Sequence, residues 1–145
     1  MTNTELLMQL KQFYQPMTTD KLSMLPQLYA DNVSFADPIQ KVQGISKLQR
    51  YFSHTLENVK YCHFVFQHEL ISGQQIYLNW HMQFAHPKLN NGQEVTVPGV
   101  SYLVLQQDGK IQHHTDYYDM GAMLYEHIPL LGWVTHKVKQ RLTLA

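Results

Sequence analysis

Four strand-like segments follow one another in the second half of the chain, and no helical segment separates them. Each alternates apolar with polar residues or is rich in aromatic and β-branched ones, and they cover residues 61–70, 75–86, 95–106 and 110–118. Turn signals lie between them at Gly73, at Asn91-Gly92 and at Asp108-Gly109, and the last predicts a two-residue hairpin turn. Consecutive strands joined in this way pair antiparallel, so their order excludes an alternating βα fold and predicts an α+β domain.

Helical periodicity marks three segments before these strands. A capping box at Thr2 and Glu5 opens a helix predicted over residues 3–15, and a third helix is predicted over residues 45–57. The second helix should be kinked or shortened by Pro26, and its apolar stripe comprises Leu22, Leu25, Leu28 and Tyr29. A strongly curved, mostly antiparallel sheet wrapped around these helices would enclose one cavity.

Residues 28–52 join the second helix to the third. Val33 and Phe35 alternate with small residues in a short strand predicted over residues 33–36. Asp37-Pro38 ends this strand, because proline cannot donate to a sheet ladder and holds the preceding residue extended. The Asp37 carboxylate is therefore fixed at a strand end, before Gly44 opens the third helix.

Composition limits the class of partner. The chain has 145 residues with eleven basic and eleven acidic side chains, so no overall field attracts nucleic acid. Cys62 is the only cysteine, which rules out an internal disulfide. The first residues lack the pattern of a signal peptide, and no apolar run is long enough to span a membrane. These features predict one cytoplasmic domain over residues 1–145, without an integral membrane segment.

The segment Leu28–Phe52 resembles the nuclear transport factor 2-like superfamily, through Tyr29-Ala30-Asp31 followed by Asp37-Pro38. This superfamily of cone-shaped α+β domains includes ketosteroid isomerases, limonene-epoxide hydrolases and SnoaL-type polyketide cyclases. The resemblance implies a shared pocket and a variable chemistry. Residues 119–142 resemble the carboxyl-terminal extension of a bacterial group of SnoaL-like proteins, so we expect residues 119–145 to form a helical extension of the domain.

Asp37 is the first candidate for catalysis. In the isomerases, the aspartate of this segment carries the base that moves a proton beside a carbonyl, and the resemblance gives that role to Asp37. A carboxylate at the mouth of an apolar cavity has a raised pKa and can exchange a proton near neutrality. The alternative is that Asp37 only caps a turn by accepting backbone N–H bonds.

The last predicted strand supplies the second set of candidates. Side chains alternate along a strand, so His114, Asp116 and Tyr118 share one face, which the resemblance makes the concave one. A His-Asp pair on one face can hydrogen-bond and serve as a general base, while Tyr118 can donate to an oxyanion. Alternatively this face contacts a dimer partner or solvent, because a register error of one residue exchanges the two faces.

Two differences between this sequence and the isomerase pattern argue against steroid isomerisation. The isomerases build an oxyanion hole from a tyrosine on the first helix and a protonated aspartate on a central strand. Those positions fall here on Phe13, with Tyr14 turned about 100° away around the helix, and on Ser101. Epoxide hydrolysis is also disfavoured, since the only arginines, Arg50 and Arg141, lie outside the predicted strands.

Several residues are candidates for binding an apolar ligand. Trp80, Met82 and Phe84 share one strand face and could line a pocket together with Phe13, Tyr14 and Ser101, or could simply be core. The histidines show no metal-binding spacing, so no metal site is predicted. No cofactor is implied.

The sequence thus favours a small-molecule-binding domain with acid-base isomerase, cyclase or lyase chemistry on a hydrophobic substrate. The alternative is a non-catalytic ligand carrier or a homodimeric interaction module, and a homodimer is expected in either case. Lys137, Lys139 and Arg141 with Trp133, Val134, Val138 and Leu142 give the extension a cationic amphipathic end. We expect this end to cap the cavity, with a dimer partner or a membrane surface as alternatives.

Overall fold

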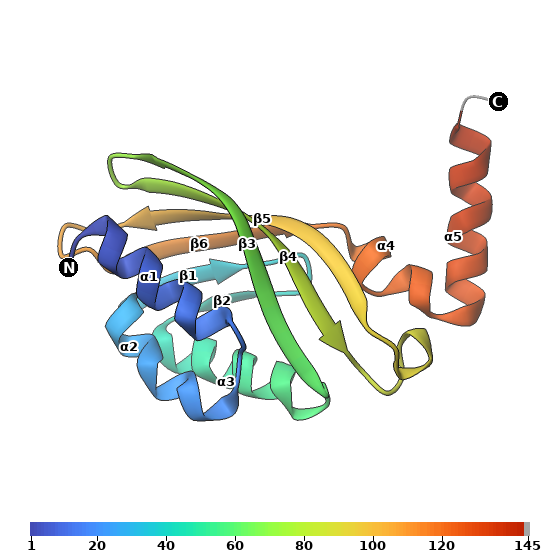
Figure 1. Cartoon of the computed structure of the whole chain (residues 1–145), viewed down its shortest axis with the longest axis horizontal. Coiled ribbons are helices and arrows are strands. Elements are labelled where there is room, and N and C mark those ends of the chain that lie inside the picture. The colour runs from blue at the N-terminus through green and yellow to red at the C-terminus, as the bar shows by residue number, and fades with distance from the viewer. Residues whose placement is uncertain (144–145) are drawn as a thin grey trace.

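The computed structural model describes residues 1–143 and contains one six-stranded sheet. Its spatial order is β2-β1-β6-β5-β4-β3, and the neighbours β1 and β6 run parallel whereas all other neighbours are antiparallel. The strands are β1 (Tyr29–Ala36), β2 (Lys41–Gln43), β3 (Tyr61–Ser72), β4 (Gln75–Ala85), β5 (Val95–Leu105) and β6 (Ile111–Tyr118). Figure 1 shows the sheet strongly curved, with α1, α2 and α3 gathered on one side of it. The α+β prediction is confirmed.

The four predicted strands of the second half are confirmed, with ends that differ by at most two residues. At the β5–β6 hairpin the predicted two-residue turn is wrong. Gln106 and Lys110 are backbone-bonded across the turn and leave three residues between them, with Gly109 at a φ of 89°. The Asp108 side chain accepts from the Lys110 N–H inside this turn, which stabilises the longer loop.

The helices follow the sequence pattern closely at α1 (Asn3–Tyr14) and α3 (Ile45–Glu57). The capping box of Thr2 and Glu5 is formed at the start of α1. The second predicted helix is broken into a 3-10 helix, η1 (Thr19–Met24), and one α-helical turn, α2 (Leu25–Leu28). Tyr29 was wrongly placed on that helix, because β1 begins four residues earlier than predicted and takes it into the sheet. The short strand β2 was not predicted.

The core lies between the helices and the concave face of the sheet. The largest fully buried side chains are Trp80, Tyr29, Phe13, Leu6, Leu10, Leu25, Leu28, Leu48, Ile76, Leu78, Leu103 and Ile111. The inward residues of β4 alternate as its sequence requires, so Trp80 and Phe84 are buried and Met82 is half-buried. The opposite face of β6 presents His113 and Tyr117 to solvent.

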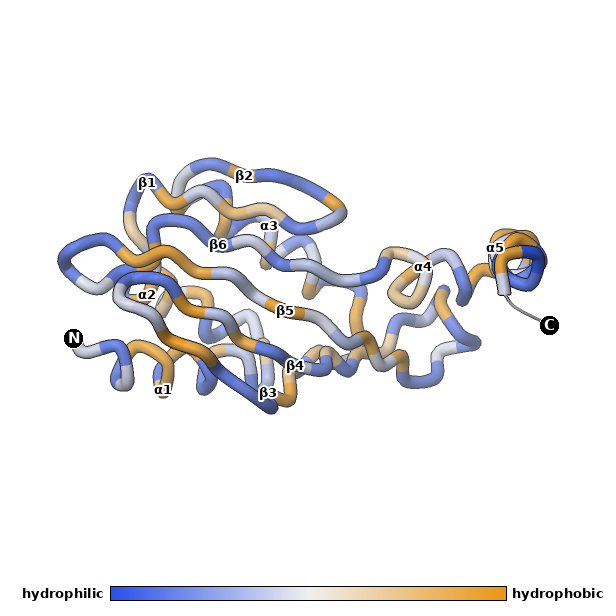
Figure 2. Tube along the Cα trace, turned by 90° about the horizontal axis from the view of Figure 1, so that it is seen from above, coloured by the Kyte–Doolittle hydropathy of each residue, from blue (hydrophilic) through white to orange (hydrophobic). Residues whose placement is uncertain are grey.

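The chain after β6 forms α4 (Met120–Met123), the 3-10 turn η3 (Tyr125–His127) and α5 (Pro129–Leu142). Met123 belongs to the core, and Met120, Ala122, Leu124 and Ile128 pack against it. Ile128 is extended, and α5 begins at Pro129, which is well tolerated in a first helical turn, and continues through Gly132. The prediction that the cationic end caps the cavity is wrong, because α5 stands apart from the body (Figures 1 and 2) and none of its residues is buried. Residues 144 and 145 of the predicted domain and extension lie outside the described residues.

Candidate functional site

Six side chains form one hydrogen-bonded chain through the core. Tyr14 Oη lies 2.9 Å from Tyr29 Oη, which lies 2.8 Å from Nδ1 of His114. Nε2 of His114 lies 2.6 Å from Oδ1 of Asp116, and the Ser101 hydroxyl donates to the same oxygen at 2.5 Å. The Trp80 indole N–H donates to Ser101 Oγ at 2.8 Å. The chain therefore joins α1, β1, β6, β5 and β4.

One arrangement of protons satisfies every bond of this chain. Tyr14 donates to Tyr29, Tyr29 donates to Nδ1 of His114, and Nε2–H of His114 donates to the ionised Asp116. If the chain takes up one further proton on Asp116, the same atoms bond in the reverse direction: Asp116 donates to Nε2 of His114, Nδ1–H donates to Tyr29, and Tyr29 donates to Tyr14. The contacts within the chain are therefore kept in both states.

Burial makes these polar groups costly unless they are paired. His114 is 2% exposed, Ser101 5% and Asp116 8%. A buried polar group without a partner costs about 1–3 kcal/mol, and an unpaired charge costs more. Both protein bonds to Asp116 end on Oδ1, and no described residue bonds to Oδ2. One carboxylate oxygen is held by structure while the other is left available.

Strand register brings the donors to Asp116. Ser101 on β5 pairs directly with Asp116 on β6, and Gly99 pairs with Trp80 on β4. A side chain at Gly99 would collide with the indole, because an added Cβ would lie 2.8 Å from Cζ2 of Trp80 and closer still to Cζ3 and Cη2. The absence of a side chain at Gly99 therefore leaves room for the Trp80 ring, whose N–H bonds Ser101.

The space beside this chain is small. Leu10, Tyr14, Phe64, Phe66, Leu78, Trp80, Ser101, His114 and Asp116 line a cavity with about 10 Å³ of free volume. This is about the volume that one water molecule needs. Phe66 is only half-buried, so the cavity has at least one wall that reaches the surface.

Asp37 forms a second polar group at the end of β1. Its Oδ1 accepts from the backbone N–H groups of Ile39 and Gln40, and its Oδ2 accepts from the Tyr51 hydroxyl at 2.6 Å. The first two bonds are those of a turn cap, and the third ties the turn to α3. Burial raises the pKa of Asp37 even though these three bonds lower it.

The charges of Asp37 and Asp116 both affect the pKa of Tyr118. Burial raises its pKa, and the negative charges of Asp37 and Asp116 raise it further. Asp116 likewise raises the pKa of Asp37 and of Tyr51. Asp37, Asp116 and Tyr118 therefore lie within electrostatic reach of one another, and Tyr118 is held neutral, as a hydrogen-bond donor must be.

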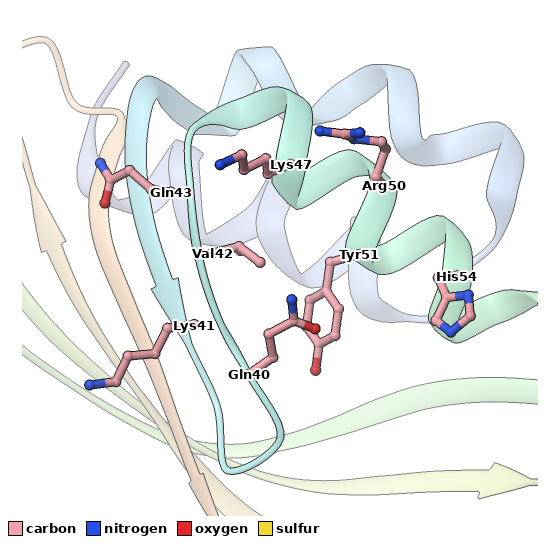
Figure 3. A pocket seen from close by; sticks show the side chains of 8 residues that line it. All are labelled: Gln40, Lys41, Val42, Gln43, Lys47, Arg50, Tyr51 and His54. Atoms are coloured by element: carbon pink, nitrogen blue, oxygen red, sulfur yellow. The ribbon is translucent and has the colours of Figure 1, made fainter.

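A larger depression lies on the surface beside Tyr51 (Figure 3). It has about 600 Å³ of free volume and is lined by Gln40, Lys41, Val42, Gln43, Lys47, Arg50, Tyr51 and His54. Two lysines and an arginine are its charged groups, and no carboxylate lines it. None of the residues that the sequence suggested for a site lies on this surface, and the strand β2 that forms part of it was not predicted.

The sequence profile of the SnoaL-like domain family matches residues 10–114, which include α2, α3 and β1 to β5 in full and parts of α1 and β6. The chain belongs to the SnoaL-like domain family. No curated protein matches it significantly by sequence. The resemblance drawn from residues 28–52 is thereby confirmed for the family.

Solved structures share the fold of this SnoaL-like chain. A candidate SnoaL-like polyketide cyclase from Jannaschia is 17% identical, with a TM-score of 0.73 over 84% of this chain and 88% of that one. A protein from Catenulispora acidiphila with a ketosteroid isomerase-like fold, solved with trimethylamine, is 15% identical, with a TM-score of 0.72 over 85% and 92%. An NTF2-like protein of unknown function from Burkholderia pseudomallei is 15% identical, with a TM-score of 0.71 over 86% and 96%.

The structure brings together most of the candidates that the sequence suggested for this SnoaL-like domain. His114, Asp116, Ser101, Trp80 and Tyr14 meet in one chain, and Asp37 and Tyr118 lie near it. Phe13, Met82 and Phe84 do not line the small cavity, and Phe13 is fully buried. Their role in binding a ligand stays a prediction.

Two functional candidates were missed. Tyr29 links Tyr14 to His114, and Tyr51 bonds Asp37. Tyr29 was interpreted as a helical apolar residue, and recognition of the full length of β1 would have turned it toward His114. Tyr51 lies beside Phe52 on α3, and only the packing of that helix against the Asp37 turn reveals its hydroxyl.

Within residues 1–143, no group of three or more His, Cys, Asp or Glu side chains is arranged to hold a metal ion. Cys62 is buried, and burial raises the pKa of its thiol to about 12.

Proposed function

We propose that this SnoaL-like chain is an acid-base enzyme of the isomerase or cyclase type, acting on a small hydrophobic molecule, with Asp116 as the main proton carrier. The observation that carries the proposal is that the two oxygens of the Asp116 carboxylate have different surroundings. Oδ1 receives both protein hydrogen bonds and Oδ2 receives none from the described residues. A purely structural carboxylate would gain by pairing both oxygens.

In this proposal Oδ2 of Asp116 takes a proton from a carbon beside a carbonyl and later returns it to another carbon. The neutral Tyr118 hydroxyl donates to the enolate oxygen that forms in between. His114 holds the carboxylate and shares its proton through the chain to Tyr29 and Tyr14. Asp37 has both oxygens bonded within the protein, so by the same criterion it caps the turn, although burial raises its pKa.

A substrate must displace side chains to reach Asp116, because the free volume there is about 10 Å³. Phe66 lines the cavity and is only half-buried, so its movement would open the site with little loss of core. The trimethylamine bound to the Catenulispora protein supports a small ligand in this fold.

The alternative function is a non-catalytic ligand carrier or a homodimeric interaction module. The small free volume favours the interaction module, since a domain that only uses its surface has no need of an open cavity. In that case the hydrogen-bonded chain would serve to fix the packing of the sheet on α1.

Deuterium exchange separates these functions. A panel of hydrophobic ketones is incubated in D2O with the wild type and with Asp116→Asn, and incorporation beside the carbonyl is followed by mass spectrometry. We expect at least one ketone to exchange about 100-fold faster with the wild type than with the variant. Ketones that raise the melting temperature without exchanging would indicate a carrier, and a panel that neither binds nor exchanges would favour the interaction module.

A further inference from the structure

The helix α5 is an isolated element at one end of the molecule. It packs mainly on η3, the turn that precedes it, and none of its residues is buried. Figure 2 shows α5 end-on and separate from the body, with hydrophobic and hydrophilic residues both present in it. A helix of this length has little stability alone in water, and helices are stabilised mainly by packing of an apolar face. Contact of the apolar side of α5 with a surface outside the chain would therefore stabilise it.

The side of α5 that meets its own chain is the polar one. The Lys139 ammonium bonds Oε1 of Glu126 at 2.6 Å, and the Gly132 α-carbon lies so close to the Glu126 carbonyl that a side chain would collide with it. Gly132 and Thr135 are the half-buried residues of the helix. Residues 132, 135 and 139 are spaced as one helical face, so this face contacts η3.

The remaining sides of α5 carry large apolar residues in water. Leu130 is 71% exposed and Trp133 is 61% exposed. The other exposed apolar residues are Leu131, Val134, Val138 and Leu142. Leu130, Val134, Val138 and Leu142 recur every four residues and form a stripe. A surface helix of a globular protein normally turns its apolar stripe inward, and here it is turned outward.

The charge of α5 is of one sign. It contains Lys137, Lys139 and Arg141 and no acidic residue, whereas residues 1–128 hold the other eight basic and all eleven acidic side chains. Lys137 and Arg141 each lie seven residues after Leu130 and Val134, so these cations share the side of the helix that bears the apolar stripe. The Lys137 ammonium also lies 5.7 Å from the centre of the Trp133 ring.

We propose that α5 is a docking helix for an anionic phospholipid surface. Its apolar first half, with Leu130, Trp133 and Val134, would enter the interface, while Lys137 and Arg141 extend their stems along the same side to reach lipid phosphates. A second copy of the chain is a less suitable occupant, because pairing of two α5 stripes would set Lys137 and Arg141 of one copy against those of the other. No helix in the described part of the chain is long and apolar enough to cross a membrane.

Vesicle co-sedimentation of the full chain tests the proposal. The probes are vesicles of phosphatidylcholine alone and vesicles with about one third phosphatidylglycerol, each at about 0.1 M and 0.5 M salt. We expect binding to the anionic vesicles at low salt, at least about 10-fold weaker binding at high salt, and little binding to phosphatidylcholine. Trp133 should shift its emission to shorter wavelength on binding, whereas Trp80 is already buried.

Paired variants locate the contact. Lys137→Gln/Arg141→Gln and Val134→Ser/Val138→Ser should each weaken binding about 10-fold or more. Lys41→Gln/Lys47→Gln removes the same charge from the exposed surface depression, and Leu70→Ser removes an exposed leucine that is 67% accessible on β3. Both controls should bind as the wild type does. Urea unfolding should be unchanged in all α5 variants, since their side chains are exposed.

The proposal is overturned if anionic vesicles bind no more protein than neutral ones. It is equally overturned if the Lys41/Lys47 control loses as much binding as the Lys137/Arg141 variant, because the body would then be the anionic contact. A dimer in light scattering that Val134→Ser/Val138→Ser converts to a monomer, without vesicle binding by the wild type, would assign the helix to a second copy.

Discussion

Substitution of Asp116 by alanine and by asparagine distinguishes the hydrogen bonds of this residue from its charge. Alanine removes the acceptor of both the His114 N–H and the Ser101 O–H, which are buried. Each donor left without a partner costs about 1–3 kcal/mol, so Asp116→Ala should lose about 2–6 kcal/mol of unfolding free energy. Because a domain has about 5–15 kcal/mol in total, this variant should be close to unfolding.

Asparagine keeps an oxygen at the position of Oδ1, so both donors keep their acceptor. Each bond changes from a charge-assisted to a neutral one, which costs about 1 kcal/mol apiece. Removal of a carboxylate from a largely apolar core recovers a desolvation penalty of similar or greater size. We therefore expect Asp116→Asn to unfold within about 1 kcal/mol of the wild type.

Urea unfolding followed by far-ultraviolet circular dichroism at pH 7 measures all three proteins under one condition. The expected order is wild type and Asp116→Asn together, with Asp116→Ala well below them. An asparagine variant as unstable as the alanine variant would refute the reasoning, because the charge itself would then be required by the fold. A stable asparagine variant that has lost deuterium exchange would assign the loss to chemistry.

The remaining predictions concern three other positions. Asp37→Asn should become more stable relative to the wild type as the pH rises from about 4. Burial raises the folded-state pKa of Asp37, so the wild type loses stability as Asp37 ionises, whereas the variant does not. Urea unfolding at a series of pH values measures this difference, and a pH-independent difference would contradict it. Gly99→Ala should lose about 1–3 kcal/mol and change the fluorescence of Trp80, because the new methyl group collides with the indole, whereas wild-type stability would show that β5 adjusts. Cys62, with a pKa of about 12, should be only about one part in ten thousand thiolate at pH 8 and should react with a disulfide reagent only after unfolding; rapid labelling of the native protein would show that the site opens.

Comparison of the two ends of the chain shows where sequence reasoning holds. The helix over residues 45–57 and the four strands after it follow from apolar spacing, and the structure has them. At the C-terminal end the predicted helical extension is present as α4 and α5, but its cationic end does not cap the cavity. The amphipathic pattern of α5 was recognised, but the pattern does not say which surface it meets.

Part of the candidate site was likewise predictable from the sequence and part was not. Alternation along β6 placed His114, Asp116 and Tyr118 on one face, because side-chain direction in a strand is a local property. The partner of Asp37 on α3 and the link from Tyr14 through Tyr29 to His114 were not predictable from local pattern. Each of these bonds depends on how a helix packs against the sheet.

The sequence by itself determined the class of fold, the order of its main elements and the family, because turns, caps and apolar periods act over a few residues. Tertiary structure alone decided that side chains from five elements, between residues 14 and 116, meet in one hydrogen-bonded chain. It also decided that α5 turns its apolar side away from the body. Both outcomes depend on strand register and helix packing, which are set by contacts between residues far apart in the chain.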